Sequence, residues 1–132
     1  MLFRSNFLRT VFGISNPEYQ KRVWIKGIGP ESDDFDEATV LFFELGALIL
    51  KDPKKFKVTD SQYVLLKTLW HAFSSFCDKP DLSHCIPEQF IDTPEWIEIT
   101  RLATDLIKSF NYHYDFLVFQ GKNWKENHTE NT

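Results

Sequence analysis

Cysteine, glycine and proline are scarce in this sequence. Its 132 residues include two Cys, five Gly and six Pro. Cys77 and Cys85 are too few to form the disulfide framework that holds small secreted domains together, and they favour a reducing, cytoplasmic location. The low glycine and proline content excludes a collagen-like or low-complexity chain.

Long hydrophobic runs and an excess of positive charge are missing as well. No segment approaches the ~20 apolar residues of a membrane-spanning helix, and the first residues lack the continuous apolar stretch of a signal peptide. With 15 Lys and Arg against 19 Asp and Glu, the formal net charge is −4. Because nucleic-acid binders neutralise phosphates with positive charge, we expect neither a nucleic-acid nor a membrane partner.

Aromatic residues, by contrast, are abundant. Thirteen Phe, four Trp and four Tyr supply ample apolar mass for a packed core, which excludes intrinsic disorder as the default state. The length fits one domain, which we expect to be helical over residues 1–121. Residues 122–132 are polar apart from one Trp and are expected to fray as a tail.

Four helix starts carry their own capping chemistry. Each has Asn, Asp or Thr placed to accept a hydrogen bond from the first turn, and two continue with proline at the first helical position. The starts are Asn16-Pro17-Glu18, Asp34-Phe35-Asp36-Glu37, Thr59-Asp60-Ser61-Gln62 and Thr93-Pro94-Glu95. They predict a short helix to about Ile25 that stops at Gly27, and three long ones ending near Asp52, Cys77 and Phe110.

Apolar residues recur at three-to-four-residue spacing along the three long segments, as on buried helix faces. The stripes are Phe35, Ala38, Leu41, Phe42, Leu45, Leu48 and Ile49; Leu66, Leu69, Phe73 and Phe76; and Trp96, Ile99, Ala103, Leu106 and Phe110. Val40, Phe43, Ala47 and Leu50 add further apolar faces to the first, so we expect that helix to be central and covered on most sides.

The predicted fold is therefore mainly all-α, a compact single-domain bundle of about four to six helices. A short N-terminal helix is expected around Phe7, and residues 78–92 are expected to form a loop. Residues 112–119 are β-prone, so this C-terminal segment is predicted either to form a short strand or irregular structure or to continue the preceding helix.

The densest charge feature is an acidic run over residues 31–37. It admits two interpretations: an acidic face for a basic partner, or helix capping and complementation of the helix dipole. Its Asp-Asp-Phe-Asp-Glu string fits an Asp-Asp-x-x-Asp/Glu metal motif, but the second metal motif is missing and so is an EF-hand glycine. No metal is predicted from this segment.

Soft metal ligands gather in one stretch, which provides an alternative of a different class. His71, Cys77, His84 and Cys85 lie within fifteen positions, so a small metal-binding protein or an enzyme using His71, His84 and Cys85 is conceivable. The Cys-x-x-Cys spacing of zinc sites is missing, as are phosphate-binding loops and nucleophile motifs. We therefore predict no catalytic residues, no metal and no cofactor, and we do not expect an enzyme.

Large aromatics exceed what a short chain should need for its core. The core of so short a chain cannot hold all five of Tyr19, Trp24, Trp70, Trp96 and Trp124. We expect at least two of them to be buried. Exposed aromatics are favoured anchors of protein interfaces. The surplus favours a binding protein or, in a third interpretation, a structural subunit of a larger complex.

Two stretches carry a resemblance to a known class of proteins. The first runs from Glu18-Tyr19-Gln20 to Gly27 and on through Gly29-Pro30-Glu31 into residues 33–38, and the second is Asp92-Thr93-Pro94-Glu95-Trp96. Together, over residues 16–111, they resemble small acidic bacterial immunity proteins encoded beside polymorphic or contact-dependent toxins. The resemblance implies a cytosolic inhibitor that binds one cognate toxin domain, often a nuclease, with acidic residues against the toxin's basic surface.

Within that hypothesis the candidate partner-binding residues are chosen on physical grounds. Glu31, Asp33 and Asp36 would supply negative charge, and Trp24 would be a neighbouring aromatic anchor.

Overall fold

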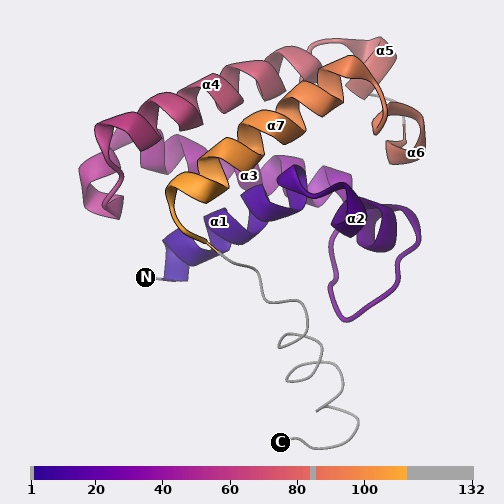
Figure 1. Cartoon of the computed structure of the whole chain (residues 1–132), viewed down its shortest axis with the longest axis horizontal. Coiled ribbons are helices and arrows are strands. Elements are labelled where there is room, and N and C mark those ends of the chain that lie inside the picture. Colours follow the sequence, from indigo (N-terminus) through magenta and orange to yellow (C-terminus); the bar gives the residue numbers. More distant parts are fainter. Residues whose placement is uncertain (1, 84–85, 113–132) are drawn as a thin grey trace, which may run out of the picture.

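The computed structural model describes residues 2–83 and 86–112, and over these residues the chain is helical without a strand (Figure 1). The four long helices are α1 (Leu2–Ser15), α3 (Phe35–Lys51), α4 (Asp60–Cys77) and α7 (Pro94–Ser109). Five short segments connect them: α2 (Pro17–Tyr19), the π-helix η1 (Gln20–Ile25), the 3-10 helix η2 (Pro53–Phe56), α5 (Pro80–Ser83) and α6 (Pro87–Phe90). The all-α prediction is confirmed. The C-terminal strand or irregular segment predicted for 112–119 and the tail at 122–132 fall outside the described residues, except for Tyr112.

The long helices form an up-down-up-down bundle. Helices α1 and α4 run in one direction and α3 and α7 in the other (Figure 1). Each helix packs on two antiparallel neighbours, since α1 contacts α3 and α7, and α4 contacts the same two. The starts of α3 and α7 consequently lie at the same end of the bundle, together with α2, η1 and α6 (Figure 1).

The predicted capping residues form the helix starts as expected. Asp34 accepts a hydrogen bond from the Glu37 N–H at 2.7 Å, and Thr93 accepts one from the Trp96 N–H at 3.3 Å. At α4 the Thr59 hydroxyl accepts from the Gln62 N–H while the Gln62 side chain accepts from the Thr59 N–H, which completes a capping box.

The N-terminal helix is longer and more central than the sequence indicated. Helix α1 has 14 residues and buries Phe7, Leu8, Val11 and Ile14 against its neighbours. It has no acidic residue in its first turn, so the sequence gives no start signal of the kind seen at the other helices. Tertiary packing of its apolar face stabilises it instead.

Helix α3 is less buried than the sequence predicted. Phe35, Phe42 and Ile49 are buried, but Val40 and Leu48 are 53% and 50% exposed. The described residues therefore leave an outer side of α3 open, and the expectation of a helix covered on most sides is wrong for this part of the chain. The predicted loop 78–92 also contains two short helices, α5 and α6.

Aromatic side chains dominate the core at the end where α3 and α7 begin. The Phe35 ring lies 4.8 Å from that of Phe90 and 5.7 Å from that of Trp96, centroid to centroid. Trp24 joins this cluster from η1, 6.1 Å from Trp96. Tyr19, Trp24 and Trp96 are buried, so these three are core rather than surface residues. Trp70 is half-buried, and Trp124 lies outside the described residues.

One polar residue lies within this apolar interior. Gln20, at the start of η1, has no exposed surface. Its side-chain nitrogen donates to the carbonyls of Gly13 and Ile14, each at 2.8 Å, and its side-chain oxygen accepts from the Trp96 indole N–H at 3.0 Å. The amide thus satisfies carbonyls at the end of α1 that the helix itself cannot pair, and it joins α1 to α7.

Core truncation on α4 provides a test of the packing. Phe73 and Leu69 have no exposed surface, so replacing either with Ala should lower the free energy of unfolding by about 2–5 kcal/mol. Val64 on the same helix is 60% exposed, and Val64→Ala should change it by less than about 0.5 kcal/mol. Urea unfolding of the three variants measures the difference. Equal effects at Phe73 and Val64 would contradict the assigned core face.

The Gln20 amide provides a second test. Gln20→Met keeps the side-chain length but removes the partners of two carbonyls and one indole N–H in a buried site. We expect a loss of roughly 2–5 kcal/mol in unfolding free energy, because buried polar groups left without partners cost about 1–3 kcal/mol each. The neighbouring exposed Lys21→Met is the control. Equal stability of the two variants would show that Gln20 does not organise the core.

Candidate partner-binding site

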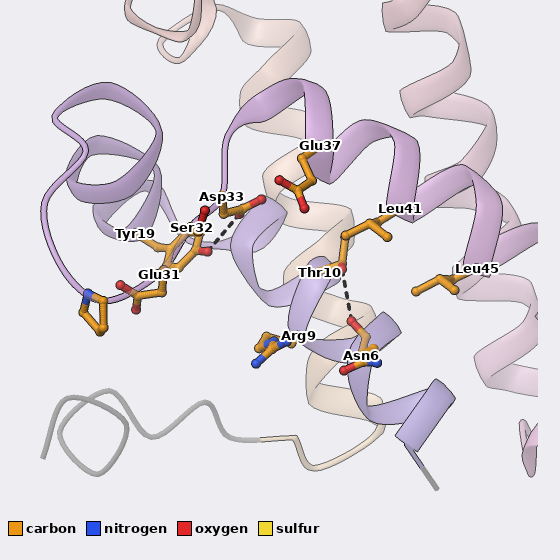
Figure 2. A pocket seen from close by; sticks show the side chains of 11 residues that line it. Asn6, Arg9, Thr10, Tyr19, Glu31, Ser32, Asp33, Glu37, Leu41 and Leu45 are labelled. Carbon is orange, nitrogen blue, oxygen red and sulfur yellow. Dashed lines mark hydrogen bonds between the residues drawn. The ribbon is translucent and has the colours of Figure 1, made fainter. Parts of the chain in front are cut away.

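The carboxylate of Asp33 is held in place by two aromatic residues. Its Oδ2 atom accepts a hydrogen bond from the Tyr19 hydroxyl at 2.8 Å and another from the Trp24 indole N–H at 2.9 Å (Figure 2 shows the first). One oxygen meets both side chains because Tyr19, at the N-cap of η1, and Trp24 within η1 lie close together, with ring centroids 6.5 Å apart.

The loop before α3 is fixed by a second interaction. Arg22 and Glu31 form a bidentate ion pair, with Nη1 donating to Oε1 at 2.8 Å and Nη2 to Oε2 at 2.7 Å. The same Nη1 donates to the carbonyl of Ile28 at 2.8 Å. The Glu31 side chain is only 7% exposed, so its charge serves the loop rather than an open surface.

A groove lies between α1, α3 and this loop (Figure 2). Its volume is about 350 Å³. Leu41 and Leu45 of α3 form an apolar side, and Arg9 of α1 lies across from them. Asp33 and Glu37 supply carboxylates at the end nearest the loop. The groove thus combines apolar surface with negative charge that is partly fixed in position.

The sequence-predicted site residues have distinct locations. Trp24 is 9% exposed and belongs to the core, so it is not available as a surface anchor. Glu31 is paired with Arg22, and Asp33 is half-buried at the groove. Asp36 alone among the four is exposed. The expectation of one exposed patch formed by these four residues is thus corrected by the burial of Trp24 and the pairing of Glu31.

Acidic residues from two distant parts of the sequence converge at one end of the molecule. The Phe35–Trp96 ring contact joins the first turns of α3 and α7, and α6 packs against η1. We use the name acidic end for the exposed carboxylates around these helix starts: Asp34, Asp36, Glu37, Glu88, Asp92 and Glu95. The sequence showed the acidic run of residues 31–37, but no local pattern indicated that Glu88, Asp92 and Glu95 would lie at the same end.

Lysines are concentrated at the opposite end of the bundle. Helices α3 and α7 end there, and the Gln62 side chain at the start of α4 donates to the Ser109 carbonyl at 2.9 Å. We use the name basic end for the exposed lysines at this end of the bundle: Lys51, Lys54, Lys55, Lys57 and Lys108. Exposed Asp52 and Asp60 also lie at this end, and exposed Lys21, Lys26 and Lys79 lie at the other, but cations predominate here and acids there. The described bundle is therefore electrostatically polar along its axis.

The alternative metal or thiol site gains no support from the described residues. His71 is exposed on α4, and the described part of the chain holds no group of three His, Cys, Asp or Glu side chains placed to bind a metal. Burial, followed by the charge of Asp78, raises the pKa of the Cys77 thiol, which disfavours the reactive thiolate. His84 and Cys85 lie outside the described residues.

Two glycines in the loop offer a test of the ion pair between Arg22 and Glu31, which we call the Arg22 clamp. Gly27 and Gly29 both have positive φ, at +65° and +115°. A Cβ at Gly29 would overlap Arg22 Nη1, whereas one at Gly27 would meet nothing within 4 Å.

Gly29→Ala should therefore lower the unfolding free energy by roughly 2–4 kcal/mol, and Gly27→Ala by about 1 kcal/mol from backbone strain alone. Equilibrium denaturation measures both changes. A larger loss at Gly27 than at Gly29 would contradict the clamp.

Comparison with known proteins gives no family for this chain. A scan of protein-family models, a search of curated proteins and a search of solved structures each found no match. Within residues 2–83 and 86–112, no helix is both long enough and apolar enough to cross a membrane. What the site can do follows from its charge and shape: it offers a carboxylate-rich surface beside a partly apolar groove.

Proposed function

We propose that this protein is a cytoplasmic binding protein that neutralises a cognate protein toxin through its acidic end. The observation that carries the proposal is the convergence of the first turns of α3 and α7, which gathers carboxylates from two separate sequence regions. Asp34 caps α3 and Glu88 lies in the first turn of α6, but local helix stability does not account for Asp92 or for the gathering of these helix starts at one end. Their common location is typical of a surface that faces a basic partner.

A toxin domain that acts on nucleic acid fits this surface in chemical terms. Such a domain needs a positively charged substrate-binding surface, because nucleic acid is bound largely through its phosphates. Carboxylates of an inhibitor can occupy that surface in place of phosphates and block it. The proposed partner class is therefore a protein toxin with a basic active-site face, with a nuclease as the leading example.

The polarity of the molecule supports the same proposal. A basic partner surface is attracted by the acidic end and repelled by the basic end, so the long-range field orients the two proteins before contact. Such steering raises the association rate and weakens as salt is added. Faster association would benefit an inhibitor that has to bind its toxin before the toxin acts.

The partner is identified first by affinity capture. The tagged full-length protein, expressed in its native cells, should retain one stoichiometric protein with a toxic domain, identified by mass spectrometry. Absence of such a protein, in cells shown to express the neighbouring genes, would contradict the proposal. Retention of several proteins of a stable assembly, none of them toxic, would indicate a structural subunit instead.

Charge reversal at the acidic end should then weaken binding of that toxin domain. The double variant Asp36→Lys/Glu95→Lys alters two exposed side chains at the starts of α3 and α7. We expect its Kd to rise roughly tenfold or more, mainly through slower association, with the wild-type Kd itself rising with salt.

The matched control reverses charge at the other end of the bundle. Lys54→Glu/Lys55→Glu changes two exposed residues of η2 and should leave the Kd within about twofold of the wild-type value. Circular dichroism verifies that both double variants keep their helices. Equal weakening by the two double variants would show that the acidic end is not the binding surface.

A further inference from the structure

Helix α3 carries an apolar stripe that the described residues cover only in part. Leu41, Leu45 and Leu48 follow the i, i+4, i+7 spacing and so share one side of the helix. Leu41 and Leu45 form the apolar side of the groove beside α1, and Leu48, 50% exposed, lies one turn further along α3. We call these three residues the groove stripe.

Carboxylates accompany the stripe along the same helix. Glu37 precedes Leu41 by one turn and lines the groove, and the exposed Glu44 lies between Leu41 and Leu48. Asp33 closes the end of the groove nearest the loop. Arg9 is the one cation among the residues that line the described groove. Negative charge thus flanks the stripe at Leu41 and Leu45, whereas the exposed Lys51 lies one turn beyond Leu48.

Asp33 lines the groove in a fixed orientation. The hydrogen bonds from Tyr19 and Trp24 hold its Oδ2 atom, and Tyr19 itself lines the groove. A cation bound by Asp33 would therefore cost little ordering of this side chain, which favours affinity. A long basic side chain could lie with its methylene groups along Leu41 and its charge near Asp33 and Glu37.

We infer that the groove stripe receives a basic, amphipathic segment of the toxin domain, in which an apolar side chain contacts Leu45 and Leu48 and a Lys or Arg contacts Asp33 and Glu37. This inference rests on the proposed function and locates part of its interface. The occupant is assigned by charge complementarity. Two other occupants of the groove are outcomes of the test. One is the basic end of a second copy of this chain, and the other is the chain's own residues 113–132.

Site-specific photo-crosslinking in native cells distinguishes these occupants. The crosslinking amino acid p-benzoylphenylalanine replaces Leu48 in the tagged full-length protein, and in a control it replaces Val64, which is 60% exposed on α4. We expect position 48 to crosslink to one peptide of the toxin domain that contains Lys or Arg. Position 64 should give no such product. Addition of Glu37→Lys should reduce the yield at position 48 about tenfold.

Other products would overturn the inference. A crosslink from position 48 to residues 113–132 would show that the chain covers its own groove, and a crosslink to a second copy would show self-association. If affinity capture retains the toxin and the Asp36/Glu95 reversal weakens its binding, but position 48 yields no toxin peptide, the groove assignment fails while the proposed function stands. If no toxic partner is captured at all, both fail.

A second variant keeps the test independent of crosslinking chemistry. Leu48→Arg places a cation on the stripe, which should raise the Kd for the toxin domain at least tenfold by repelling a basic segment. Its urea midpoint should equal that of the wild type, because Leu48 is half-exposed. A large fall in the midpoint would indicate that the rest of the chain covers the stripe. An unchanged Kd would also overturn the inference.

Discussion

The buried amide of Gln20 is the interaction on which the arrangement of the bundle depends. It pairs carbonyls at the end of α1 and the indole of Trp96 in α7, while its own backbone begins η1. An apolar side chain at this position would leave these groups buried without partners. By fixing η1 between the two helices, Gln20 also fixes Trp24, which contacts Phe35 and Trp96 at the starts of α3 and α7.

The π-helical turn connects this interior to the surface. Tyr19, just before η1, and Trp24 within it both donate to Asp33, and Arg22 of η1 pairs with Glu31 in the following loop. Two acids of the 31–37 run therefore order the loop, and Asp34 caps α3. Asp36 and Glu37 remain exposed to solvent. Capping and binding interpretations of the run are thus compatible, because Asp34 serves the cap, whereas Asp33 and Glu37 line the groove and Asp36 is exposed.

The alternation of helix direction organises the charge of the whole molecule. Helices favour acids in their first turn and cations in their last, because of the helix dipole. Since α3 and α7 run in the same direction, their acidic starts coincide at one end, and Lys51 and Lys108 of their last turns lie at the other. This rule of helix stability on two parallel helices, together with the lysines of η2, gives the described bundle its polarity.

Local signals in the sequence determined the all-α class, the starts of α3, α4 and α7 and the core stripe of α4, because caps and 3.6-residue periodicity act within a few neighbouring residues. They did not reveal the length of α1, which packing stabilises, nor the π-helical form of η1. Only the tertiary structure decided that Trp24 is buried, that Glu31 pairs with Arg22, and that Glu95 lies at the same end as Asp36. Those relations join residues that no periodic pattern connects, so they exist only once the helices have packed.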